Sequence, residues 1–297
     1  NKNVPYMITE YNGHMFPTKM QDQEERLVEH TKRHYEVVNA IAIDNHIAGG
    51  TGWCAFDYHT HYDFGSGDRI CYHGVYDMFR NPKFASTVYS SQMDTDKKII
   101  LEPITIYARG ERAIGGITPL MISTNCDYVE VYFKDIMIAK EYPATNKYPG
   151  LKHPPIIINI EQNIPGVSSM NWEDLKVIGY INGKAEIERK YLKNPTFKEL
   201  QIFSDDKEIN SINEGSAWDS TRITIKAADS WGNRLPYINE AINIEVKGAG
   251  ELIGNDNPVL EGGYYSFWVK TNTKKGIIKI TVSNKRVESK SIEIKVK

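Results

Sequence analysis

Apolar residues in the first part of the chain follow two different periods. Residues 4–9 form a short apolar run that ends at Glu10, as a buried strand does. Between residues 22 and 40 the apolar side chains recur about every 3.6 residues, which predicts an amphipathic helix. Residues 47–56 form a second strand-like run, which three glycines interrupt. Glycines inside a strand indicate that a neighbouring backbone or a ligand approaches closely. These glycines are Gly49, Gly50 and Gly52.

A polar and aromatic loop at residues 58–72 and a helix at residues 82–91 are expected to follow. The order strand, helix, strand, loop and helix is typical of α/β folds. A closed (β/α)8 barrel takes about 250 residues, so the first 92 residues can supply only part of one. Because the chain enters its first strand almost at once, we expect residues 1–92 to be the C-terminal portion of a TIM-barrel catalytic domain with a truncated N-terminus.

Beyond residue 92 short strand-like runs alternate with turn residues, which is typical of β-sandwiches. The runs lie at 120–123, 129–133, 156–160, 177–180, 200–203, 222–227, 241–246, 264–269, 277–282 and 291–296. A break near residues 193–195 divides this region in two. The expected fold is therefore mainly β, with a partial (β/α)8 barrel segment (1–92) followed by two immunoglobulin-like β-sandwich domains (93–195 and 196–297).

Composition and charge exclude several classes of protein. The 36 Lys and Arg against 38 Asp and Glu give a net charge of −2, without the clustered basic face of nucleic-acid-binding proteins. No apolar run approaches the ~18 residues of a membrane span. The three cysteines form no CxxC pair, so we expect small buried side chains rather than a disulfide framework or a zinc ribbon. A truncated N-terminus carries no information on a signal peptide, so the compartment, cytoplasmic or secreted, stays open.

Residues at the predicted strand ends are the candidates for chemistry. Catalytic groups in α/β barrels sit at the C-terminal ends of strands, where Glu10 lies; a surface salt bridge is the alternative. Trp53 offers a flat apolar face that can pack against a sugar ring or fill a core. Asp57 and Tyr58 could hydrogen-bond sugar hydroxyls or hold their loop in shape. The loop's histidines match no metal-binding motif, so no metal site is predicted.

Residues 7–19 and 49–92 resemble the end of the catalytic barrel of glycoside hydrolase family 2 enzymes, most closely the β-galactosidase-like members. In that family a Glu-Tyr pair closes the seventh barrel strand; here the pair is Glu10 and Tyr11. The family's eighth strand ends in Gly-Gly-x-x-Trp-x-x-x-Asp, matched by Gly49, Gly50, Trp53 and Asp57. The resemblance implies that Glu10 is the nucleophile and that Trp53 helps to form the floor of the galactosyl pocket. The expected substrate-binding residues are Tyr11, Asn12, His14, Trp53 and Asp57.

The later modules are similar to the domains that often follow the barrel in this family. Residues 123–131 and 177–180 resemble an immunoglobulin-like module, and residues 218–223 with Gly262 and Gly263 resemble the final sandwich module. The resemblance implies a retaining β-galactosidase that hydrolyses terminal β-D-galactosides. A β-glucuronidase or β-mannosidase of the same family is the alternative, as are sandwich modules that act as carbohydrate-binding or spacer units.

The implied mechanism needs a second carboxyl group, placed about 5–5.5 Å from the nucleophile. In the family this acid/base is a Glu that follows an Asn on the fourth barrel strand. Asn-Glu occurs here only at 213–214 and 239–240, in the final module, so we expect the chain alone to be inactive.

The expected partners follow from that reading. They are the remaining N-terminal part of the enzyme and a β-galactoside or related oligosaccharide. Assembly into a homo-oligomer stays open, and neither nucleic acid nor a membrane is expected as a partner. His73 precedes Gly74 where well-studied bacterial β-galactosidases have an Asn tied to a monovalent-cation site. No cofactor is therefore certain, and a divalent or monovalent cation in the complete enzyme stays an open prediction.

Overall fold

The computed structural model describes residues 4–13, 16–112, 117–160, 172–212 and 217–297. The chain divides into two compact units, Asn1–Asn194 and Pro195–Lys297. Strands predominate in both. Within the described residues no helix is long and apolar enough to cross a membrane.

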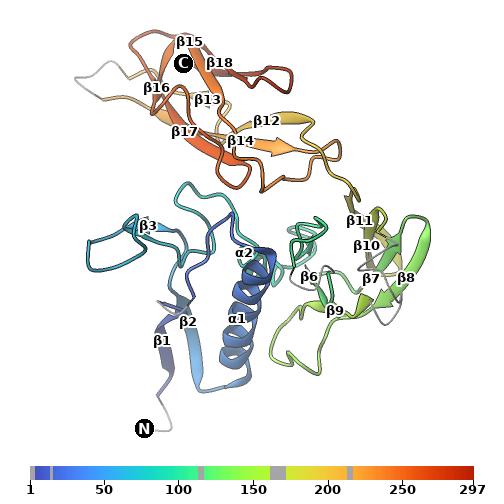
Figure 1. Ribbon diagram of the computed structural model, residues 1–297. Helices are drawn as coiled ribbons and strands as arrows, with labels where there is room; N and C mark the ends of the chain where they lie inside the picture. The colour runs from blue at the N-terminus through green and yellow to red at the C-terminus, as the bar shows by residue number, and fades with distance from the viewer. Residues whose placement is uncertain (1–3, 14–15, 113–116, 161–171, 213–216) are drawn as a thin grey trace. The chain divides into compact units, whose positions relative to one another are not determined.

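The first unit begins with a strand-helix-strand element. Strands β1 (Tyr6–Tyr11) and β2 (Ile47–Gly52) pair in parallel, and α1 (Glu24–Ile43) connects them. Figure 1 shows α1 beside the two strands. Parallel pairing directs the carboxyl ends of both strands to one edge of the sheet. The predicted strands and helix are confirmed here, while their place in a larger barrel stays a prediction.

The segment after β2 differs in detail from the predicted loop and helix. A short hairpin, β3 (Tyr58–His59) with β4 (Ile70–Cys71), occupies the predicted loop. Helix α2 (Ser86–Ser90) has five residues instead of the ten predicted at 82–91. The reason is a backbone hydrogen bond from Lys83 N to Val75 O (3.0 Å), which holds the residues before Ser86 against an extended segment.

Two sheets face each other over the middle of the chain. One has the order β5-β6-β9, formed by β5 (Leu101–Pro103), β6 (Leu120–Thr124) and β9 (Ile156–Ile158). The other has the order β11-β10-β7-β8, formed by β7 (Tyr128–Phe133), β8 (Ile136–Glu141), β10 (Leu175–Ile181) and β11 (Lys184–Tyr191). Apolar residues from both sheets share one core, including Ile122, Val131 and Val177.

A second core of the first unit joins its helices to these sheets. Tyr35 of α1 and Val88 of α2 pack with Ile104, Met121 and Tyr148. Nearby, the buried carboxylate of Glu24 in α1 accepts a hydrogen bond from Arg112 Nε (2.6 Å). Residues on both sides of position 92 therefore contribute to one packed interior.

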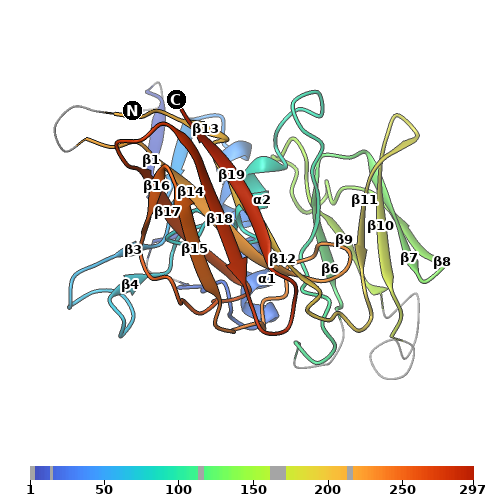
Figure 2. The same cartoon turned by 90° about the horizontal axis from the view of Figure 1, so that it is seen from above.

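The second unit is a two-layered β structure with its own core. One sheet has the order β12-β14-β17-β16, formed by β12 (Glu199–Ser204), β14 (Ser220–Ala228), β16 (Gly250–Ile253) and β17 (Tyr264–Thr271). The other has the order β13-β19-β18-β15, formed by β13 (Glu208–Ile209), β15 (Asn243–Gly248), β18 (Gly276–Ser283) and β19 (Lys290–Val296). Figure 2 shows these two layers, and their facing side chains form a single apolar core.

Candidate active site

Glu10 and Trp53 lie at the carboxyl ends of the two parallel strands. Glu10 is the penultimate residue of β1, and Trp53 directly follows β2. Tyr11 pairs with Gly52 in the strand register, and Trp53 N–H donates to Tyr11 O (2.8 Å). In parallel sheets, ligands bind outside the carboxyl ends of the strands. The strand pairing thus brings together the two residues that the sequence placed 43 positions apart.

Gly13 lies between the side chains of Glu10 and Trp53. A Cβ atom added to Gly13 would stand 2.8 Å from Glu10 Oε1 and 3.6 Å from Trp53 Cβ. The Glu10 carboxylate and the Cβ atom of Trp53 therefore border the same small space at Gly13. Glu10 is exposed, and 39% of the Trp53 surface is exposed, so both side chains are accessible to a ligand.

Tyr11 faces away from this space. Glu10 Oε1 lies beside Gly13, whereas the Tyr11 ring lies against Gly50 and Gly52 of β2. The Tyr11 ring covers Gly52 of β2, and its hydroxyl is 3.0 Å from the hydroxyl of Tyr89 in α2. Tyr89 OH in turn lies 2.8 Å from His34 Nδ1 in α1. This hydrogen-bond chain ties the end of β1 to both helices.

Burial determines the charge of His34, the histidine in that hydrogen-bond chain. His34 is 1% exposed, and burial, with a smaller contribution from Lys83, lowers its pKa to about 4. Its ring contacts that of His30, edge to face, with centroids 4.9 Å apart, and burial also lowers the pKa of His30. Both imidazoles are therefore neutral near pH 7.

Asn12 and His14 are the two remaining residues predicted on the loop after β1. Asn12 has a φ of 62°, a left-handed conformation that asparagine adopts more readily than most residues. Its Nδ2 is buried without a hydrogen-bond partner among the described atoms. His14 lies outside the described residues.

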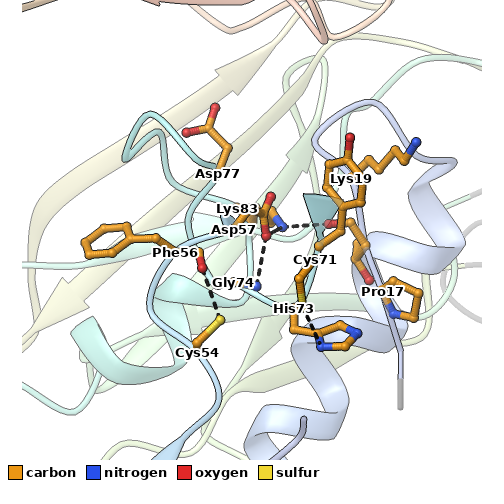
Figure 3. A network of polar contacts seen from close by, with 12 residues as sticks. Pro17, Lys19, Cys54, Phe56, Asp57, Cys71, His73, Gly74, Asp77 and Lys83 are labelled. Carbon is orange, nitrogen blue, oxygen red and sulfur yellow. Dashed lines mark hydrogen bonds and ion pairs between the residues drawn. The ribbon is translucent and has the colours of Figure 1, made fainter. Parts of the chain in front are cut away.

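Asp57 is buried, and its carboxylate belongs to a network of polar contacts (Figure 3). Its Oδ1 accepts hydrogen bonds from Lys83 Nζ (2.6 Å) and Gly74 N (2.9 Å), and Lys83 also donates to Thr18 O (2.6 Å). Burial raises the pKa of Asp57 to about 6 and lowers that of Lys83, while the ion pair opposes both shifts. The geometry favours the second of the two sequence hypotheses for Asp57, in which it holds the loop.

Tyr58 orients Trp53 from the base of the β3–β4 hairpin. Trp53 Nε1 donates to Tyr58 OH (3.1 Å), and the two rings meet edge to face with centroids 6.0 Å apart. Desolvation, together with a hydrogen bond to Cys71, raises the pKa of Tyr58 to about 12. The Trp53 indole is therefore fixed by a protonated hydroxyl.

Sequence reasoning missed the roles of Lys83, Tyr89 and His34 around these residues. His34 gave a signal, because it falls on the apolar face of the predicted helix at residues 22–40. Lys83 and Tyr89 gave none, since their partners Asp57 and Tyr11 lie 26 and 78 positions away. Within the described residues no group of three or more His, Cys, Asp or Glu side chains is placed to hold a metal ion.

The chain is similar to known proteins over most of its length. The model of the glycoside hydrolase family 2 C-terminal domain 5 matches residues 204–293. A β-galactosidase of Thermoanaerobacterium thermosulfurigenes is 51% identical over 265 residues, which cover 88% of this chain and 36% of the relative. A β-galactosidase of Rhizobium meliloti is 38% identical over 266 residues, covering 88% of this chain and 35% of the relative. The chain thus spans about a third of the length of these relatives.

The fold has a counterpart among solved structures. The crystal structure of a β-glycosidase from Bacteroides vulgatus superimposes with a TM-score of 0.68 at 18% identity, covering 88% of this chain and 32% of that one. This likeness concerns the fold alone. The domain match and the two relatives identify the chain as glycoside hydrolase family 2 sequence, similar over most of its length to part of two β-galactosidases.

Proposed function

We propose that the chain is part of a retaining β-galactosidase in which Glu10 is the nucleophile. The observation that carries this proposal is the position of Glu10 and Trp53, which border one space at the carboxyl ends of two parallel strands. A carboxylate beside an exposed aromatic face is the arrangement that a retaining glycosidase needs for attack on a bound sugar. The similarity to two β-galactosidases supports galactosides as the substrate class.

In the proposed mechanism Glu10 attacks the anomeric carbon of the galactosyl group. The glycosidic bond breaks, an acyl linkage to Glu10 forms, and the leaving oxygen takes a proton from a second carboxyl group. That group then removes a proton from water, which displaces Glu10 and releases galactose. Trp53 would pack against the C–H face of the sugar, while Tyr11 would act indirectly by fixing the end of β1 through Tyr89.

In this proposal the chain is part of a longer polypeptide, as its much longer relative suggests, and the second carboxyl group lies in the rest of that polypeptide. Neither Asn-Glu pair of the chain takes that role in this proposal. Asn239 and Glu240 lie in the second unit, where Glu240 pairs with Arg286, and residues 213–214 lie outside the described part of the structure. We therefore propose that the 297-residue chain alone does not hydrolyse galactosides, because two positioned carboxyl groups are most of the chemistry.

The nucleophile assignment is tested in the longer polypeptide with an aryl β-galactoside. Glu10→Gln should lower kcat by roughly three orders of magnitude or more, since the amide cannot attack. The matched control is Glu25→Gln, an exposed glutamate in the first turn of α1, which should retain full activity. An unaltered kcat in Glu10→Gln would refute the assignment.

The substrate class is tested on the same protein with aryl β-glucuronides and β-mannosides. Preferential hydrolysis of the galactoside is the expected result. Preference for either alternative glycoside would replace β-galactosidase by that activity, and turnover by the 297-residue chain alone would show that the acid/base lies within it.

A further inference from the structure

The β3–β4 hairpin ends in an exposed pair of stacked rings. The rings of His61 and Tyr62 lie with centroids 4.7 Å apart and an interplanar angle of 16°. Tyr62 is 74% exposed, the highest value among the large apolar side chains that the structure describes. Figure 1 shows the hairpin, labelled β3, extending away from β1 and β2. An aromatic side chain so exposed on an ordered loop is a candidate ligand contact.

The tip of the hairpin is held by its own hydrogen bonds. Asp63 N–H donates to His61 Nδ1 (3.2 Å), and Phe64 N–H donates to His61 O (3.0 Å). Further down, Thr60 N–H donates to Arg69 O (2.8 Å). The ring pair is therefore preformed, so a ligand that packs on Tyr62 would not have to order the loop first.

The base of the same hairpin contacts the candidate active site. Tyr58 accepts the indole N–H of Trp53 (3.1 Å). Tyr62 lies four residues further along, so its Cα is at most about 14 Å from that of Tyr58. Trp53 and Tyr62 are thus two exposed aromatic side chains, and the hairpin that carries Tyr62 is joined at its base to Trp53.

We propose that Tyr62, backed by His61, binds the leaving group of the substrate and so determines which β-galactosides are preferred. This inference rests on the proposed function, in which Trp53 holds the galactosyl ring. The group on the other side of the glycosidic bond then extends outward, past the loops at the carboxyl ends of the strands. A second pyranose or an aryl ring presents an apolar face that packs on a tyrosine ring.

The experiment compares two substrates that share the galactosyl group and differ in the leaving group. In the longer polypeptide, Tyr62→Ala should lower kcat/KM for lactose about three- to tenfold, as expected for loss of one ring contact. The value for methyl β-galactoside, which has no ring as leaving group, should stay unchanged. Tyr62→Phe keeps the ring and should behave as the unaltered protein. The matched control is Tyr142→Ala, which removes a tyrosine that is 60% exposed and follows β8. This variant should leave both kcat/KM values unchanged.

Each outcome decides between the claims. An unchanged ratio of the two kcat/KM values in Tyr62→Ala would overturn this inference, and so would an equal loss on both substrates, which would indicate a general effect on the site. Either result leaves the proposed function intact, because the longer polypeptide without substitutions still hydrolyses both galactosides. Absence of hydrolysis of any galactoside by the unaltered protein would overturn the proposed function and this inference with it.

Discussion

At the residue scale, the Asp57–Lys83 ion pair shows how a loop beside the candidate site is fixed. The side chains of both residues are almost fully buried, and Lys83 reaches across to Thr18 O as well as to Asp57. A buried pair contributes little compared with apolar residues of the same volume, but the loss of one member leaves the other charge uncompensated. The pair therefore makes the segment after Trp53 sensitive to single substitutions.

The first prediction concerns this pair. Lys83→Met should lower the free energy of unfolding by about 3–5 kcal/mol, because Asp57 keeps its burial and loses its cation. Urea unfolding followed by circular dichroism measures the change. Lys97→Met is the control: Lys97 pairs with Asp96 at 3.6 Å with both side chains 70% exposed, so its loss should hardly matter. Equal stability of the two variants would show that the buried pair is dispensable.

The buried histidine His34 predicts a dependence of stability on pH. Its pKa of about 4 in the folded chain lies below the ordinary value of 6.5 that applies after unfolding. Between these values the unfolded chain binds more protons, so the free energy of unfolding falls as the pH falls. From pH 7 to pH 5 this residue alone should account for a loss of about 2 kcal/mol.

His34→Gln tests that contribution, since the glutamine side chain does not titrate. The variant should lose about 2 kcal/mol less than the unaltered chain between pH 7 and pH 5, measured by urea unfolding at several pH values. The same slope in both proteins would contradict the lowered pKa of His34 in the folded state.

At the scale of elements, glycines fix the packing of β2 against β1. A Cβ at Gly52 would stand 3.1 Å from both the Tyr11 ring and the Tyr89 hydroxyl, whereas a Cβ at Gly49 would meet no atom within 4 Å. The sequence predicted the close approach of a backbone or a ligand at all three glycines of this run. The atoms that approach Gly50 and Gly52 are instead side-chain atoms, chiefly of Tyr11, and a ligand near Gly49 stays a prediction.

The third prediction compares two alanine substitutions in this one strand. Gly52→Ala should lower the free energy of unfolding by about 1–3 kcal/mol, because the Tyr11 ring has to move. Gly49→Ala should be neutral or stabilising by about 0.4–1 kcal/mol, since it only restricts the unfolded chain. Thermal and urea unfolding measure both. A Gly52→Ala variant as stable as Gly49→Ala would show that the Tyr11 contact adapts without cost.

Some strands could be predicted from the sequence and others could not. Strand β7 alternates between buried and half-buried positions, and its run was visible in the sequence. Strands β8 (IMIAKE) and β11 (KAEIERKY) do not alternate strictly between apolar and polar residues, and they were missed. Glu10 and Trp53 could be proposed from strand ends and family resemblance. The environment of Asp57 could not, because its partner Lys83 has no local signature.

At the scale of the whole molecule, the cores define which parts can be separated. The second unit has a core drawn only from its own residues, such as Ile223, Phe267 and Ile280. In the first unit, by contrast, Tyr35 and Val88 pack with Met121 and Tyr148. Helices α1 and α2 therefore pack against the β5-β6-β9 sheet. That residues 1–92 form a separate domain stays a prediction, and this packing is evidence against it.

The last prediction is that residues 195–297 fold alone and residues 1–92 do not. A fragment of residues 195–297 keeps both of its sheets and its whole core, so it should unfold cooperatively in urea. A fragment of residues 1–92 would expose Tyr35 and Val88, which are fully buried in the chain, and lacks the apolar partners that cover them. It should show no cooperative transition and poorly dispersed amide NMR signals. Residues 1–194 together restore that core and serve as the control. A cooperative transition in the 1–92 fragment would mean that the helices are stabilised by β1 and β2 themselves, and that the sheets beyond residue 92 only dock onto an element already folded.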